Sequence, residues 1–125
     1  MLPNIQPNQM ALAYDLIVNL EPFCNWAKEE GGTNFPHSDE IEFRIIGDRR
    51  AFAWKLSKLN GTHVIAYSHT APAQVHYFVM YMAHEIIHLY QAINGLENRS
   101  QHNSDFRARA EEVCAIHGYD LRMFV

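Results

Sequence analysis

The sequence predicts a single α+β domain, and three observations lead to this class. At 125 residues the chain fits one domain, which can remove roughly two-thirds of its unfolded surface from water. Hydrophobic residues make up 48% of it and charged residues 19%, an ordinary globular composition. Apolar residues recur at helical spacing before and after a middle section of the chain, and in that section apolar and polar residues alternate. We therefore expect an N-terminal helix, a three-stranded antiparallel sheet, a central helix and a C-terminal helix within residues 1–125.

The first helical region runs from Asn8 to about Glu30. Its apolar residues recur at the spacing of one helix face, beginning with Leu12, Leu16 and Leu20. Pro22 suits the first turn of a second helix, so the pattern is compatible with one helix or with two. Gly31-Gly32 then ends the region.

Three strands are expected next. Residues 40–46 alternate apolar with charged side chains, which suits a strand with one buried face. Two β-prone runs, 51–56 and 63–68, flank Asn60-Gly61, a dipeptide that favours a hairpin. An antiparallel sheet is the simplest arrangement of these three segments.

The central helix is expected from Pro72 to Asn94, because Pro72 suits a first turn and Gly95 is the first breaker after it. At about 100° per residue, large side chains fall on two opposite faces of this helix. One face carries Val75, Val79, Met82, Ile86, Leu89 and Ile93. The other carries Tyr77, Tyr81, His84 and His88. We expect both faces to be buried, which places this helix at the centre of the domain.

A last helix is expected from about Asp105 to His117. Asn103 or Ser104 can cap its start, and Gly118 suits its C-terminal end. Asp105 also suits the positive end of the helix dipole. No repeat or linker divides the sequence into further units.

Charge and composition narrow the classes of function. The net charge is −4, which argues against sequence-independent binding of nucleic acid through clustered Lys and Arg. Neighbouring arginines such as Arg49-Arg50 are interpreted as solvated surface. Cys24 and Cys114 form no Cys-x-x-Cys pair and are expected to be reduced.

The sequence also bears on the cellular location. Residues 1–10 lack the charged start and apolar run of a signal peptide, and no stretch reaches the roughly 20 apolar residues of a membrane span. We therefore expect a cytoplasmic protein without a membrane partner. Its oligomeric state is left open.

The strongest chemical signal is the HExxH motif His84-Glu85-Ile86-Ile87-His88. Its two imidazoles lie one helical turn apart, so both can coordinate one cation, with a carboxylate beside them to act as general base. Chance would produce only about 0.04 such matches in a chain of this composition. A pair of ordinary core histidines is the alternative. The motif predicts a metal site with His84 and His88 as ligands and Glu85 as catalytic base.

A catalytic zinc usually has three protein ligands and one water, so a third ligand is needed. The metzincin pattern is excluded, because it requires Gly and His where this chain has Gln91 and Asn94. His102, in the polar loop 14 residues beyond the motif, is the preferred third ligand. A glutamate from the last helix, Glu111 or Glu112, is the alternative. Three imidazoles with one open position suit Zn²⁺, one ion per chain.

The motif, the length of the loop and His102 followed four positions later by Phe106 together resemble the SprT-like, or Spartan-type, metallopeptidases. The order of elements is similar too, since that family places an N-terminal helix and a short antiparallel sheet before the motif helix. The resemblance spans nearly the whole chain. It departs at Asn103, where the family commonly has Gly. No cysteine-rich zinc ribbon follows Gly118 in the printed sequence, so the resemblance is to a short form of the domain.

The resemblance implies a minimal zincin-like fold and a zinc endopeptidase that hydrolyses peptide bonds. It implies protein or peptide substrates, including proteins bound to or crosslinked with DNA. It also implies that the strand at 63–68, directly before the motif helix, borders the cleft and pairs with an extended substrate. Two other functions stay open: a regulatory metallopeptidase that cuts one specific partner protein, and a non-catalytic zinc-binding module.

Overall fold

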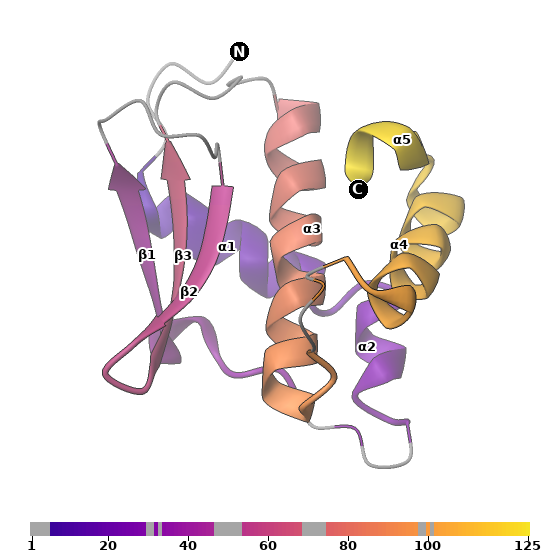
Figure 1. Cartoon of the computed structure of the whole chain (residues 1–125). Helices are drawn as coiled ribbons and strands as arrows, with labels where there is room; N and C mark the ends of the chain where they lie inside the picture. Colours follow the sequence, from indigo (N-terminus) through magenta and orange to yellow (C-terminus); the bar gives the residue numbers. More distant parts are fainter. Residues whose placement is uncertain are drawn as a thin grey trace.

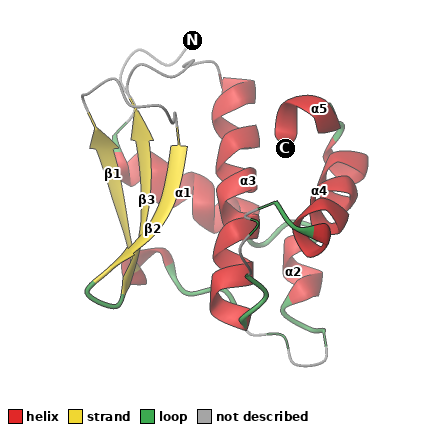
Figure 2. Ribbon diagram, in the orientation of Figure 1, coloured by secondary structure: helices red, strands yellow, loops and turns green. Residues whose placement is uncertain are grey.

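A computed structural model describes residues 6–29, 32, 34–46, 54–68, 75–97, 100 and 102–125 of the chain. The strands follow one another in the chain between two groups of helices, as expected for an α+β protein, so the predicted class is confirmed (Figures 1 and 2). In chain order the elements are α1 (Pro7–Ile17), α2 (Phe23–Trp26), a 3₁₀-helix (Ser38–Glu40), β1 (Ile41–Ile46), β2 (Trp54–Leu59), β3 (Thr62–Ser68), α3 (Val75–Asn94), α4 (Ser104–His117) and α5 (Leu121–Phe124). The predicted helix stop at Gly31, the arginine pair Arg49-Arg50 and the predicted helix start at Pro72 lie outside the described residues.

The three strands form a mixed sheet in the order β1-β3-β2, so the prediction of an all-antiparallel sheet is wrong. β2 and β3 pair antiparallel around Asn60-Gly61, whose φ angles of 52° and 81° are both positive, and the predicted hairpin is confirmed. β1 instead lies along the other edge of β3 and runs parallel to it, with Ile41 opposite His63. A hairpin turn determines only the pairing of the two strands that it joins. It therefore carries no information about the edge that β1 takes.

β3 is the central strand, and its residues Val64–Ser68 are all buried. A continuous buried run of this kind is typical of a strand covered on both faces. Because β1 and β2 occupy its two edges, β3 has no free edge along residues 63–67, and the expectation that it pairs with an extended substrate is wrong. The sheet edge next to α3 belongs to β2, which contacts that helix (Figure 1).

α1 packs against α3 and β1 through Met10, Tyr14 and Ile17, all of which are buried. The leucines that give this segment its helical period point to solvent instead, and Leu12, Leu16 and Leu20 are exposed. Both sets recur at helical spacing, so the spacing alone does not show which set faces the core. After α1 the chain forms the separate short helix α2, which settles the number of helices in this region as two.

α3 is the central helix, as expected, and it lies between the sheet and the helices α4 and α5 (Figure 1). Its apolar face contributes Met82, Ile86 and Leu89, which are fully buried in the core. The helix ends at Asn94, and Gly95 follows with a φ of 67°, the left-handed conformation expected of a glycine cap. The opposite face of α3 carries the histidines.

Both predicted ends of the last long helix are confirmed. The side-chain oxygen of Asn103 accepts a hydrogen bond from the Phe106 N–H at 2.9 Å, and Gly118 ends α4 with a φ of 75°. A further short helix, α5, was not predicted; it packs against α3 and α4 and buries Phe124. No helix in the described part of the chain has the length and apolar character needed to cross a membrane.

Candidate metal centre

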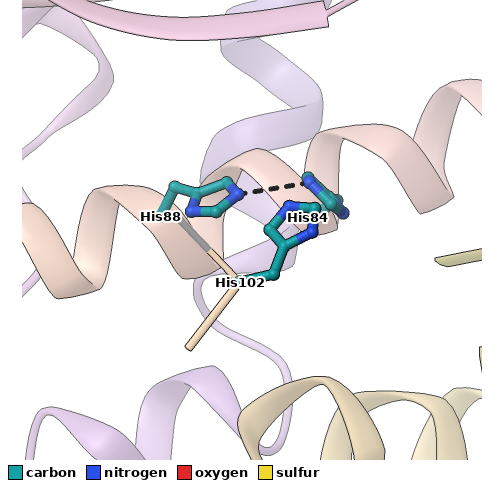
Figure 3. A group of neighbouring side chains, drawn as sticks. All are labelled: His84, His88 and His102. Atoms are coloured by element: carbon teal, nitrogen blue, oxygen red, sulfur yellow. Dashed lines mark hydrogen bonds between the residues drawn. The ribbon is translucent and has the colours of Figure 1, made fainter. Parts of the chain in front are cut away.

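Three histidines from two segments of the chain meet beside α3 (Figure 3). His84 and His88 lie one turn apart on this helix, and their Nε2 atoms are 3.2 Å apart. His102 reaches the same place from the turn before α4, with its ring centroid 5.1 Å from that of His84 and 5.2 Å from that of His88. One nitrogen of each ring lies within 4.8 Å of the other two. The three histidines are therefore close enough to bind one metal ion.

Phe106 supports two of these rings from the first turn of α4. It is fully buried, and its ring stacks on His88 and on His102 with centroid distances of 4.5 Å in both cases. The interplanar angles of 17° and 15° are those of nearly parallel rings. The aromatic residue four positions after His102 thus limits the tilt of two imidazoles at once.

Hydrogen bonds on the outer side of the two motif histidines determine which nitrogens face the centre. His84 Nδ1 lies 2.6 Å from the carbonyl oxygen of Phe124, and because a carbonyl can only accept, this nitrogen carries the proton. A side-chain hydrogen bond with Gln91 raises the pKa of His88, against the effect of burial, and a bond with this effect is one in which the ring donates. Since Nε2 of each ring faces the other ring, both Nε2 atoms present lone pairs. No proton then lies between the Nε2 atoms of His84 and His88, the contact marked in Figure 3. Their two lone pairs repel each other, and a bound cation would relieve this repulsion.

Burial and mutual repulsion keep the histidines neutral. Burial, followed by the nearby His102, lowers the pKa of His84 to about 4, although the Phe124 carbonyl opposes the shift. Burial, followed by His84 and His102, lowers the pKa of His88 to about 3. Burial also lowers the pKa of His102. All three imidazoles are therefore neutral at pH 7, the form that coordinates metals.

Glu85 follows His84 directly on α3, and its side chain bonds to the sheet. Its side chain is buried, with 6% of the residue exposed, and burial raises its pKa to about 7. The backbone N–H of Leu56 in β2 donates to its carboxylate and partly opposes that shift. The carboxylate is thus held at the outer edge of β2, next in sequence to one of the clustered histidines.

The glutamates considered as alternative ligands lie elsewhere. Glu112 accepts a hydrogen bond from the indole Nε1 of Trp26 at 2.8 Å, and Glu111 is exposed. Among the described residues, neither belongs to the group of side chains that could share one metal ion. The structure brings together the residues preferred from sequence, His84, His88 and His102.

Two partners of the centre were not predicted. Phe124 contributes a backbone carbonyl, for which a sequence carries no signal. Gln91 could have been found, because it is a polar residue three positions after His88 on a helix expected to be buried on both faces. It is in fact 1% exposed.

No family model matches the chain, and no curated protein or solved structure matches it either. What the centre can do chemically therefore rests on its own residues and their geometry.

Proposed function

We propose that the protein is a zinc-dependent endopeptidase of the SprT-like type, with His84, His88 and His102 as ligands and Glu85 as general base. One observation carries this proposal: three neutral imidazoles converge beside α3, and the residue after the first of them is a buried carboxylate whose pKa is close to neutral. The resemblance of the HExxH motif, His102 and Phe106 to that family rests on the same residues and supports it.

The donor set fits zinc. Zn²⁺ binds imidazole nitrogen at about 2.0–2.1 Å in tetrahedral geometry, which separates two ligand nitrogens by about 3.3 Å. The Nε2 atoms of His84 and His88 are 3.2 Å apart. Three neutral nitrogen donors also suit zinc better than Mg²⁺ or Ca²⁺, which prefer oxygen ligands. One zinc ion per chain is therefore proposed.

The number of ligands favours a catalytic site over a structural one. In the part of the chain that the structure describes, the group of potential ligands has three members. Structural zinc sites are normally closed by four protein ligands, whereas catalytic sites keep one position for water. This difference argues against the alternative of a non-catalytic zinc module.

The proposed reaction divides the chemistry between the metal and Glu85. Bound zinc would lower the pKa of its water to about 7 and polarise a peptide carbonyl. Glu85 would accept a proton from that water and deliver it to the leaving amine. Its own pKa of about 7 suits both transfers near neutral pH.

An extended substrate is assigned to the outer edge of β2. In the described sheet β2 is an edge strand, and the pairing is assigned to its backbone groups other than the Leu56 N–H, which already donates to Glu85. Pairing of a peptide with a sheet edge uses main-chain hydrogen bonds and reads few side chains. We therefore propose broad selectivity for unfolded or extended protein segments, with proteins on DNA as the substrate class implied by the resemblance.

The experiment compares wild-type protein with Glu85→Gln, both loaded with zinc, in the hydrolysis of unfolded casein with and without DNA. The variant should keep one zinc per chain and lose about 10²–10⁴-fold in rate, because only the proton acceptor is removed. Glu112→Gln is the matched control and should keep its activity, since Glu112 bonds to Trp26 and not to the centre.

Three outcomes would count against the proposal. Full activity in Glu85→Gln would remove Glu85 as the base, and wild-type protein without zinc would remove the metal centre. A zinc-loaded wild type that hydrolyses no substrate would remove the peptidase reaction. Stimulation by DNA would support a DNA-directed peptidase, and its absence would favour the cutting of a specific partner protein.

A further inference from the structure

Gln91 contacts both segments that supply the histidines. It lies on α3 three residues after His88, and only 1% of it is exposed. A buried amide needs partners for its oxygen and its nitrogen, because an unpaired polar group loses its hydration without compensation. The partners that Gln91 has therefore show what the residue does.

The amide of Gln91 bonds on three sides. Its Nε2 donates to Asn103 Oδ1 at 3.0 Å and to Asp105 Oδ2 at 2.9 Å, which uses both of its N–H groups. Because both N–H groups are used, the amide oxygen is the atom left for the side-chain hydrogen bond between Gln91 and His88. One side chain thus joins a motif histidine to the start of α4.

Asn103, the residue directly after His102, transmits this contact to the loop. Its Oδ1 also accepts from the Phe106 N–H, and its Nδ2 donates to the Leu96 carbonyl at 3.1 Å. The backbone beside His102 is therefore tied both to the end of α3 and to the first turn of α4. Asn103 can accept from Gln91 because its side chain carries a carbonyl oxygen.

We propose that Gln91 is a positioning residue of the metal centre, which orients His88 through its amide oxygen and holds the turn that bears His102 through its amide nitrogen. This inference rests on the proposed metal centre and does not depend on the peptidase reaction. Gln91 acts only through the two histidines. Among side chains of this size, an amide alone offers one acceptor and two donors together, whereas Glu lacks the donors and Met lacks both.

Asp105 and Asn103 have other hydrogen bonds besides those with Gln91, and this distinguishes the positioning of His88 from general stabilisation of the α4 start. Asp105 also accepts from Arg109 Nε at 3.0 Å, and Asn103 still caps α4 if Gln91 is removed. The α4 start therefore keeps hydrogen bonds of its own. The outer nitrogen of His88, in contrast, loses the acceptor that determines its tautomer.

The test compares Gln91→Met with Tyr90→Phe as the matched control. Tyr90 is the adjacent residue, and its hydroxyl donates to the Trp26 carbonyl at 3.0 Å in a buried contact. Each variant removes buried hydrogen bonds from the same turn of α3, but only Gln91 touches a histidine. Zinc affinity is measured by competition with a chromophoric chelator, and site geometry by the visible absorption of the Co²⁺-substituted protein.

Gln91→Met should raise the zinc Kd by about 10–100-fold, as expected when a partner that orients a ligand is lost. It should also change the Co²⁺ spectrum, whereas Tyr90→Phe should lower thermal stability and leave both metal readouts unchanged. If Gln91→Met binds zinc as tightly as wild type, or if Tyr90→Phe weakens binding equally, the positioning role is refuted. Failure of the wild type to bind zinc would instead refute the metal centre itself.

A measurement on the metal-free protein tests the same inference independently. Long-range ¹H–¹⁵N spectra should show His88 protonated on Nδ1 in the wild type and shifted toward the Nε2 tautomer in Gln91→Met. Gln91→Glu is the second variant: it keeps an acceptor for His88 but loses both donors to the α4 start. It should retain the wild-type tautomer while still weakening zinc binding through His102, and loss of that tautomer in Gln91→Glu would contradict the assigned contact.

Discussion

Two polar clusters lie around adjacent residues of the same turn of α3. The histidine cluster consists of His84, His88 and His102. The Arg109 cluster consists of Arg109 and its partners Asp105, Glu29, Trp26 and Tyr90. Gln91 contacts the first, and its neighbour Tyr90 belongs to the second. In the histidine cluster, burial lowers the pKa of His84 and His88, and neighbouring imidazoles lower it further. Three side chains able to carry positive charge are thus held together in neutral form.

The Arg109 cluster is built in the opposite way. The guanidinium of Arg109 pairs with Asp105 at 3.0 Å and with Glu29 at 3.5 Å. It also lies 4.9 Å from the ring centroid of Trp26 and 4.4 Å from that of Tyr90. Arginine stays charged in proteins, so carboxylates and aromatic faces here surround a permanent cation.

The difference shows how two polar clusters on one helix serve different purposes. Where the chain supplies its own cation, acidic and aromatic neighbours satisfy it and the cluster stabilises the packing of α2, α3 and α4. Where the chain supplies only lone pairs, the three ring nitrogens are close enough to bind one cation. We therefore expect changes in the two clusters to affect different measurements.

The largest effect is expected from removal of a ligand. His102→Ala should weaken zinc binding by more than the about 10–100-fold expected of a residue that only orients a ligand. Glu112→Ala should leave zinc content unchanged and cost about 1 kcal/mol of stability through the lost bond with Trp26. Elemental mass spectrometry and chelator competition measure both. Zinc that persists in His102→Ala and falls in Glu112→Ala would replace the three-histidine centre by a glutamate-ligand site.

The next effect concerns the pH dependence of the metal-free protein. Burial lowers the pKa of His84 from 6.5 to about 4 and that of His88 from 6.5 to about 3. Below pH 6.5 and above these lowered pKa values, the two histidines bind protons in the unfolded chain but not in the folded chain. Stability should therefore fall as the pH falls from 6.5 toward 4. Glu85 acts oppositely, because its raised pKa of about 7 favours the folded state below that pH. Two histidines outweigh one glutamate, so net stability should rise with pH from about 4.5 to 6.5.

Urea unfolding at a series of pH values checks this expectation. The slope below pH 6.5 should decrease in His88→Gln, which cannot bind a proton in either state. A metal-free protein that becomes more stable on acidification across this range would show that the histidines are not held neutral by burial.

The smallest effect on the metal is expected in the Arg109 cluster. Arg109→Met should lower the free energy of unfolding by about 1–3 kcal/mol, because Asp105 and Glu29 lose their cationic partner. Zinc affinity should stay within about twofold of wild type, since Arg109 touches none of the three histidines. Thermal unfolding and chelator competition measure the two quantities. A large loss of zinc affinity would show that the two clusters are coupled through Asp105.

Several features followed from local sequence. The hairpin at Asn60-Gly61, the Asn103 cap and the glycines that end α3 and α4 each depend on the conformational preference of one or two residues. The spacing of His84 and His88 places both on one helix face wherever that helix lies in the fold. These features are predictable because every atom involved lies within a few residues in the chain.

Other features depended on segments far apart in sequence, and only the tertiary structure decided them. The edge of β3 that β1 occupies, the exposure of Leu12, Leu16 and Leu20, and the burial of Met10 and Tyr14 all follow from which surfaces pack together. His102 lies close to His84 and His88 because the turn before α4 carries it there, whereas Glu112 bonds to Trp26. The proton on His84 is placed by a backbone carbonyl 40 residues away, and every residue has such a carbonyl. The sequence by itself thus determined which side chains could bind a metal, whereas the packing of distant segments determined which of them meet and in which protonation state.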